Sequence, residues 1–207
     1  MPKLLFFAAW TAAALLYGAE PIVLPPPETG GGRPLMETLA KRRSTREFSE
    51  EALSLQTLSN LLWAAFGVNR PATGGRTAPS AWNHQEIDIY LFTPDGVYLY
   101  IAFGHRLDKV LDGDRRGAAG SPEFARAPVS LVYVADHSRS PRTPVWEKEK
   151  YAYVSTGFIG QNVYLFGASE GLGTVIHDSA DKGALSRLLG LGPGRQIILA
   201  QAVGRPK

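Results

Sequence analysis

The chain has 207 residues, of which 44% are hydrophobic and 20% are charged, a composition that fits one folded domain and excludes disordered and collagen-like proteins. It contains no cysteine, which excludes disulfide scaffolds, thiolate catalysis and iron–sulfur clusters. The formal net charge is only +3 and the basic residues are scattered, so nucleic acid is not expected as a partner.

Residues 1–19 have the pattern of a secretory signal peptide. Lys3 supplies a positive charge, residues 4–17 are apolar and uncharged, and the small residues Gly18 and Ala19 follow. The apolar run is too short for a comfortable membrane span. The protein is therefore expected to be exported, to the periplasm, with no stable membrane span after cleavage. The alternatives are a core helix or an uncleaved anchor, and a cytoplasmic protein if the segment is not a signal.

Residues 20–33 are predicted to form a tether in front of the folded domain. Pro25, Pro26 and Pro27 stiffen its first part, and the glycine run at 30–32 makes its second part flexible. The remaining residues, 34–207, are predicted to form one domain.

The first two predicted elements of the domain are helices over residues 34–41 and 54–65. The first has leucine and methionine along one side. Ser54 can cap the second, in which leucines recur at helical spacing, and Gly67 ends it.

The middle of the chain is predicted to consist mainly of strands. Residues 87–92 and 97–103 flank a Thr-Pro-Asp-Gly turn and indicate a β-hairpin. Residues 106–111 are expected to form a short helical turn. The β-branched run at 129–135 is typical of a central strand that is buried on both faces.

The longest uninterrupted segment, residues 146–170, is predicted to be one long helix. Gly157, Gly160 and Gly167 fall on one side of it together with Tyr164. Each helical glycine costs about 1 kcal/mol, which a close helix–helix contact or a flat ligand would offset. Tyr164 itself is expected to be a core or dimer contact.

A short helix over 182–189 and a final strand over 196–203 end the chain. No segment of the sequence repeats another. Because helices and strands do not alternate strictly, the fold class indicated is α+β rather than a doubly wound sheet.

The first segment that carries chemistry is Arg42-Arg43-Ser44-Thr45-Arg46. Three guanidinium groups and two hydroxyls lie within five residues. They indicate an anion site, because the guanidinium fork matches the oxygens of phosphate. The alternative is a solvated basic end of the first helix, which is also favoured by the helix dipole.

Two further segments are rich in polar groups or glycine. Residues 76–85 contain Ser80, Asn83 and Gln85, whose donors and acceptors suit the ribityl hydroxyls and ring amides of a flavin; a plain loop could have the same composition. Residues 170–179 combine two glycines, which let a ligand approach the backbone, with polar side chains.

Several motifs, in this order and spacing, carry a family resemblance. They are RRSTREF at 42–48, WAAFG at 63–67, RTAPSAWNHQEIDIYLF at 76–92, GLG at 171–173 after the long helix, and VGRP at 203–206. With them, the sequence from about residue 34 to residue 207 resembles the FMN-dependent nitroreductases. It is most similar to their short SagB-like (SagB/ThcOx-type) dehydrogenase branch.

This resemblance implies a three-layer α+β fold, in which helices flank a mainly antiparallel central sheet. It also implies a homodimer with one FMN in each of two sites at the subunit interface. Small molecules are the implied substrates, and NAD(P)H is a possible reductant.

The resemblance further implies three FMN-binding segments. The first would hold the phosphate, ribityl chain and pyrimidine side, the second would reach the flavin from the other subunit, and the third would lie against the ring near N5. In chain order their residues are Arg42, Arg43, Ser44 and Arg46; Pro79, Ser80 and Asn83; and His177, Asp178 and Ser179. Many relatives have an acidic residue followed by glycine at the third segment, where this chain differs. His177 is the candidate catalytic residue there.

The expected function is that of an oxidoreductase that transfers hydride through flavin N5. The reductant would be NAD(P)H or an organic substrate, and the acceptor a small molecule such as a nitroaromatic or a quinone. The alternative is an exported, non-catalytic protein that binds or stores flavin.

Two other types of site are disfavoured by the sequence. Residues 167–171 spell G-x-S-x-G, the nucleophile-elbow pattern of serine hydrolases, but they follow a predicted helix where that motif requires a strand. The four histidines are not spaced as metal ligands, so no metal site is expected.

Overall fold

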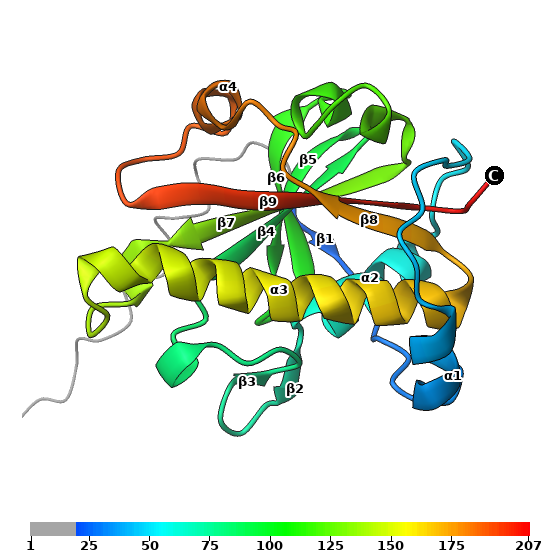
Figure 1. The fold of residues 1–207 in the computed structure, drawn as a ribbon, viewed down its shortest axis with the longest axis horizontal. Coiled ribbons are helices and arrows are strands. Elements are labelled where there is room, and N and C mark those ends of the chain that lie inside the picture. Colours follow the sequence, from blue (N-terminus) through cyan, green and yellow to red (C-terminus); the bar gives the residue numbers. More distant parts are fainter. Residues whose placement is uncertain (1–19) are drawn as a thin grey trace, which may run out of the picture.

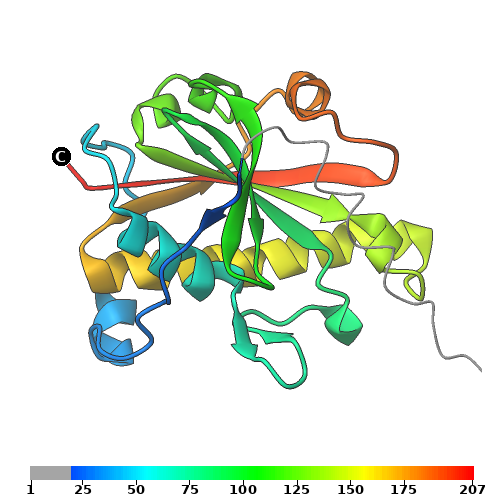
Figure 2. The same ribbon diagram turned by 180° about the vertical axis from the view of Figure 1, so that it is seen from behind.

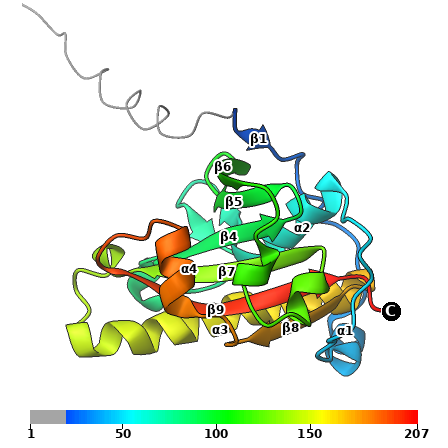
Figure 3. The same cartoon turned by 90° about the horizontal axis from the view of Figure 1, so that it is seen from above.

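The computed structural model describes residues 20–207, and the predicted signal peptide at 1–19 lies outside the described residues. Seven strands form one sheet in the order β1-β6-β5-β4-β7-β9-β8, and every neighbouring pair in it is antiparallel (Figures 1 and 3). The strands are β1 (Ile22–Val23), β4 (Ile87–Thr93), β5 (Gly96–Ile101), β6 (Arg106–Asp112), β7 (Val129–Asp136), β8 (Gly173–His177) and β9 (Arg195–Gly204). The strands β2 (Val68–Arg70) and β3 (Gly75–Arg76) form a separate small ribbon.

Helices lie on both faces of the large sheet. They are α1 (Leu35–Lys41), α2 (Leu55–Phe66), α3 (Val145–Glu170) and α4 (Lys182–Leu188). In Figure 1, α3 crosses the front of the view along the sheet, while α4 lies above β9. Short 3₁₀ turns occur at Ala81–Asn83, Arg116–Ala118, Phe124–Arg126 and His137–Arg139.

Strand β7 shows how the core is divided into two layers. Leu131 and Tyr133 belong to the apolar cluster that contains residues of α2 and α3, whereas Val132 and Val134 belong to the cluster that contains Leu185 of α4. The side chains of a strand alternate between its two faces. In a strand covered on both sides, all of them are buried, so the sequence is apolar throughout and does not alternate with polar residues. The prediction of a doubly buried central strand and the expected three-layer α+β class are both confirmed.

The two hairpin strands and the helices lie within one or two residues of their predicted positions. Ser54 accepts a hydrogen bond from the Thr57 amide at the start of α2, as a capping serine does. Towards the other end of the chain, Gly171 ends α3 in the left-handed conformation, with φ of 74°.

The helical turn predicted over 106–111 is wrong, because these residues form strand β6. This strand pairs with β5 on one side and with β1 on the other, so its backbone groups are bonded in the sheet. Leu107 is buried in the core, while Arg106 and Asp108 pair with each other on the outside. Strand β8 is an element that the sequence analysis did not predict.

The segment over 20–33 is not a free tether in the structure. Ile22 and Val23 pair with β6 as its edge strand, and Leu24 is buried in the main core. Ser59 of α2 donates a hydrogen bond of 2.6 Å to the Pro25 carbonyl. The prolines and glycines let the chain follow the surface from β1 to α1, as seen from behind in Figure 2.

Two of the three glycines of α3 lie against the sheet rather than against another helix. A Cβ on Gly160 would lie 2.9 Å from Cδ1 of Ile176, and one on Gly167 would lie 3.1 Å from the carbonyl oxygen of Leu172. Gly157 is exposed, with open space around it. Close approach of α3 to β8 and β9 therefore accounts for Gly160 and Gly167 but not for Gly157.

Replacing Gly96 tests the close approach of β5 to β6. A Cβ at this position would overlap the backbone carbonyl oxygen of Leu111 on β6. We expect Gly96→Ala to lower the free energy of unfolding by about 2 kcal/mol or more, because the backbone must shift. Gly117→Ala, which meets open space at an ordinary φ, should change it by less than about 0.5 kcal/mol. Urea unfolding of both variants measures the difference, and equal effects would contradict the close packing of β5 on β6.

Candidate functional site

The arginine-rich segment after α1 runs along β8, at the edge of the sheet. Ser44 bridges to Thr174 in parallel fashion, and the Thr45 amide donates a 3.0 Å hydrogen bond to the Thr174 carbonyl. Gly173 allows this contact, because a Cβ there would lie 2.7 Å from Cγ2 of Thr45. The segment is thus fixed by backbone contacts and does not depend on its charged side chains.

Tyr164 of α3 joins this segment to β8. Its hydroxyl accepts a 3.0 Å hydrogen bond from the Ile176 amide and lies 2.9 Å from Ser44 Oγ. The guanidinium carbon of Arg42 lies 5.2 Å from the centroid of the Tyr164 ring, within the range of a cation–π contact. Since the phenol can donate its own proton to Ser44 Oγ, the Ser44 hydroxyl can donate to a third group.

A cleft of about 500 Å³ opens beside these residues. Arg42, Arg43 and Thr45 line it together with Tyr164. Lys41, also in its lining, pairs with Glu37 at 2.6 Å. Among residues 20–207, Arg42 and Arg43 have no carboxylate partner, so their charge is available to an anion.

Arg46 lies in a neighbouring cleft of about 420 Å³ and not in the one that contains Arg42. Phe48, Arg126 and Lys207 line this second cleft with it, together with residues of the segment 122–123. In the described part of the chain Arg46 has no carboxylate partner either. The structure therefore places the predicted cationic residues along two adjoining clefts.

His177 ends β8 and packs against the segment that borders the Arg46 cleft. Its ring stacks on Phe124 with centroids 4.1 Å apart, and its Nδ1 lies 3.1 Å from Ser179 Oγ. Its Nε2 is buried and has no hydrogen-bond partner in the described structure. Burial lowers the pKa of His177 to about 4, and nearby Asp178 opposes this shift. The imidazole is therefore neutral at pH 7.

The two residues after His177 are also held by specific contacts. Asp178 forms an ion pair of 2.7 Å with Lys182 at the start of α4. Ser179 Oγ accepts a 3.0 Å hydrogen bond from the Ser121 amide. The loop over 177–179 is thus tied both to α4 and to the segment before β7.

The second predicted segment, which contains Pro79, Ser80 and Asn83, lies elsewhere in the same chain. Trp82 in this loop packs on Tyr151 of α3, with ring centroids 5.5 Å apart. Tyr151 and Tyr164 are thirteen residues apart on one straight helix, about 20 Å along its axis at 1.5 Å per residue. A single chain therefore does not bring residues 79–83 to the cleft beside Arg42.

Sequence reasoning missed the polar groups that support β8. Gln201, fully buried on β9, donates from Nε2 to Thr174 Oγ1 at 2.9 Å and accepts a 2.6 Å hydrogen bond from the Tyr133 hydroxyl. Tyr164 was expected only as a core or dimer contact. Its position one turn from both Gly160 and Gly167 indicated a close contact on that side of the helix, but not that its hydroxyl bonds to β8.

Ser169, in the G-x-S-x-G pattern, does not have the setting of a nucleophile. It lies in the last turn of α3, with no strand leading into it. Its hydroxyl accepts a 3.0 Å hydrogen bond from the Arg33 amide and donates to Glu170 Oε1 at 2.9 Å. No histidine contacts it within residues 20–207, so nothing there could activate it.

Metal-binding clusters and membrane spans are both absent from the described residues. No group of three or more His, Cys, Asp or Glu side chains within 20–207 is arranged to hold a metal ion. None of the helices in that range combines the length and apolar character that crossing a bilayer requires.

Comparison with known proteins decides the family. The model of the nitroreductase family matches residues 39–205, which is most of the chain. The chain belongs to the nitroreductase family. Its three-layer architecture, with a large antiparallel sheet between helices, is the fold of that family's solved members.

Individual nitroreductase relatives extend this comparison. A Methanocaldococcus jannaschii protein that is named as a candidate nitroreductase is 36% identical over 152 residues, which are 68% of this chain and 76% of the relative. The crystal structure of a candidate nitroreductase from Ralstonia eutropha JMP134 matches with a TM-score of 0.86 and 40% identity, covering 90% of each chain. A Desulfovibrio desulfuricans structure, solved in complex with FMN, shares the fold at a TM-score of 0.60 and 21% identity, covering 85% of this chain and 88% of that one.

The buried imidazole of His177 predicts a pH dependence of stability. Its folded pKa of about 4 is below the value near 6.5 of an unfolded histidine, so the unfolded chain binds more protons between these values. Stability is therefore lost as the pH falls from 6.5 through 4. His177→Phe keeps the stack on Phe124 but has no imidazole to protonate. Between pH 7 and pH 4.5 its free energy of unfolding should therefore fall by about 1–2 kcal/mol less than that of the wild type. Thermal unfolding at both pH values tests this, and identical losses would show that His177 is not buried in this way.

Proposed function

We propose that this protein is an FMN-dependent oxidoreductase that transfers hydride through flavin N5 between a reductant and a small acceptor, such as a nitroaromatic or a quinone. The observation that carries the proposal is the pair of guanidinium groups, without carboxylate partners in the described part of the chain, at the edge of β8 beside a cleft of about 500 Å³. The FMN in the Desulfovibrio desulfuricans structure supports it, because that protein shares this fold.

The residues in the first segment fit the chemistry of a phosphorylated flavin. Arg42 and Arg43 have no carboxylate partner among the described residues, and Ser44 can donate from its hydroxyl while accepting from Tyr164. A phosphate would thus meet both charge-assisted and neutral donors, which is the kind of set that binds phosphate strongly. Arg46, in the adjoining cleft, would contact a more distant part of the same ligand.

We assign the loop over 177–179 to the flavin ring side of the site. When bound, FMN supplies the hydride chemistry, and the protein supplies binding and orientation. His177 is neutral at pH 7 because its burial lowers its pKa, so it would act as a hydrogen-bonding or shaping group and not as an imidazolium acid. The carboxylate of Asp178 is directed to Lys182.

We further propose that the active form is a homodimer formed through α3. Exposed apolar side chains lie along one side of this helix, at Trp146, Tyr153, Val154 and Phe158. Gly157 lies among them with open space around it, midway between Tyr151 and Tyr164. A two-fold axis at Gly157, with the two α3 helices antiparallel, would bring residues 79–83 of one chain to the Arg42 cleft of the other.

The source of the electrons depends on where the protein works, and we propose export on the strength of the pattern at residues 1–19. Nicotinamide nucleotides are largely cytoplasmic, so an exported protein would take hydride from an organic substrate, as a SagB-like dehydrogenase would. NAD(P)H would be the donor for a cytoplasmic protein. Steady-state turnover with a quinone under anaerobic conditions separates an enzyme from a flavin-storing protein, whose bound flavin would not cycle.

Arg42→Ala tests the flavin site. We expect the dissociation constant for FMN to rise at least about tenfold, because one charge-assisted contact contributes about 1.5–3 kcal/mol. The control is Arg142→Ala, which removes an exposed arginine outside both clefts and should leave FMN affinity unchanged. Titration of apoprotein followed by flavin fluorescence gives both constants. Wild-type protein that binds no FMN would contradict the proposed function.

Phe158→Glu tests the dimer. A carboxylate placed on the apolar side of α3 would be buried opposite its own copy, so we expect monomers and a loss of FMN affinity together. Val23→Glu places the same charge on the exposed edge strand β1 and should leave the dimer intact. Sedimentation velocity of both variants, at matched concentration, reports the outcome. A dimeric Phe158→Glu protein would rule out this face of α3 as the interface.

A further inference from the structure

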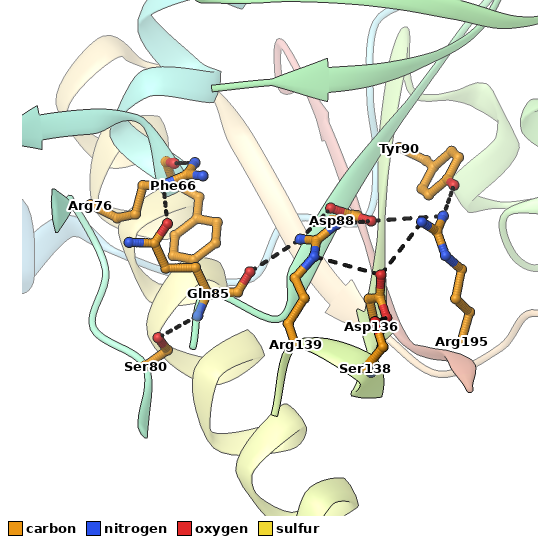
Figure 4. Close-up of polar contacts among 10 residues, drawn as sticks. All are labelled: Phe66, Arg76, Ser80, Gln85, Asp88, Tyr90, Asp136, Ser138, Arg139 and Arg195. Carbon is orange, nitrogen blue, oxygen red and sulfur yellow. Dashed lines mark hydrogen bonds and ion pairs between the residues drawn. The ribbon is translucent and has the colours of Figure 1, made fainter. Parts of the chain in front are cut away.

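Gln85 is the centre of a hydrogen-bonded cluster next to the loop over 79–83, and Figure 4 shows its contacts with Ser80 and Arg139. Its amide donates a 2.9 Å hydrogen bond to Ser80 Oγ, and its carbonyl accepts one of 3.2 Å from Arg139 Nη1. Its side-chain Nε2 donates to Asn83 Oδ1 at 3.0 Å and to the Gly74 carbonyl at 2.9 Å. The backbone and the side chain of one residue thus hold both polar side chains of the loop.

Two arginines connect Gln85 to the rest of the domain. Arg76 Nε donates to Gln85 Oε1 at 2.9 Å, and the guanidinium of Arg76 lies 5.0 Å and 5.4 Å from the ring centroids of Phe66 and Phe103. Its Nη1 also donates to the Phe66 carbonyl at 2.9 Å. An arginine bonded and flanked in this way has little freedom, so it fixes the side chain of Gln85.

The second arginine fixes the backbone of Gln85 from the opposite side. Arg139 forms an ion pair of 2.8 Å with Asp88 on β4 and a longer one of 3.6 Å with Asp136 on β7. Arg195 of β9 contacts both of these carboxylates, at 3.8 Å and 3.5 Å (Figure 4). Arg139 is thus anchored on two strands of the central sheet, through carboxylates that it shares with Arg195 of a third strand.

The loop needs such support because its backbone is strained. Trp82, Asn83 and Gln85 have φ values of 48°, 55° and 51°, in the left-handed region that side chains other than glycine rarely adopt. Strained positions of this kind persist only where surrounding contacts determine them. Gln85 meets that requirement, because it bonds Ser80 before the strained residues and Asn83 among them.

We infer that Gln85 is a positioning residue that presents Ser80 and Asn83 to the flavin of the opposite subunit. This inference rests on the proposed function. Gln85 is not itself available as a flavin ligand, because its amide, its carbonyl and both side-chain polar atoms are bonded within the chain. Ser80 keeps its hydroxyl proton, and Asn83 Nδ2 has no acceptor among the described residues. Both can therefore donate outward, to groups such as flavin carbonyls.

The first test is the affinity of Gln85→Ala for FMN. We expect the dissociation constant to rise at least about tenfold, because the loop loses the contacts that hold its donors in place. The matched control is Gln196→Ala, since Gln196 is also bonded at both ends of its amide, to His137 and Glu149, but does not touch the loop. Wild-type affinity in Gln85→Ala would overturn the inference and leave the proposed function standing. Absence of FMN binding in the wild type would instead overturn the function itself.

The second test separates positioning from folding by using mixed dimers of Gln85→Ala and Arg42→Ala subunits, isolated with two affinity tags. If Gln85 acts on the opposite subunit's site, one site of the mixed dimer carries both defects and the other carries none. We therefore expect one FMN per dimer, bound with wild-type affinity. If Gln85 acts within its own chain, both sites are defective and no wild-type site is found, which would overturn the inference.

Gln85→Glu is a second variant for the same test, to be used if Gln85→Ala does not fold. It keeps an acceptor for Arg76 Nε but loses the donor to Asn83 and Gly74. We expect weaker FMN binding than in the wild type and the same recovery in mixed dimers with Arg42→Ala. Unchanged affinity in this variant would overturn the inference, because the hold on Asn83 would then not matter to flavin binding.

Discussion

Helix α3 sets the geometry on which the proposed site depends. It is 26 residues long, and Gly160 and Gly167 on its inner side let it lie close to β8 and β9. Near its C-terminal end it holds the arginine segment through Tyr164, and near its N-terminal end it contacts the loop at Trp82 through Tyr151. Because a helix cannot shorten, these two regions stay about 20 Å apart in one chain. A site that needs both can form only between two chains.

The arginine segment and the loop over 79–83 are held in place by different kinds of interaction. The arginine segment is tied to β8 by its backbone, which leaves its guanidinium groups able to contact an anionic ligand. The loop over 79–83 has the opposite arrangement. Its strained backbone is held by Gln85 and the neighbours of Gln85, and the side chains of Ser80 and Asn83 keep neutral donors that are not used by these contacts. Strong electrostatic binding at one end and directional hydrogen bonding at the other would match a ligand with a phosphate and a polar ring.

The elements with a strong local pattern were predicted well from the sequence, as in the long helix and the buried run of β7. Those that depend on a distant partner were not. Strand β6 has no clear period of its own and is defined by pairing with β5 and β1, and the segment at 20–33 is ordered by contacts such as that of Ser59 with Pro25. For the site, the sequence indicated the cluster of arginines over residues 42–46, but not that Arg46 lies in a separate cleft. Nor did it indicate that the polar atoms of Gln85 are bonded within its own chain.

A crystal structure of the full protein grown with FMN tests the central claim most directly. We expect a symmetric dimer with two flavins, in which the phosphate of each contacts Arg42 and Ser44 of one chain and the ring lies beside residues 79–83 of the other. A flavin bound wholly within one chain, or bound away from the edge of β8, would contradict it.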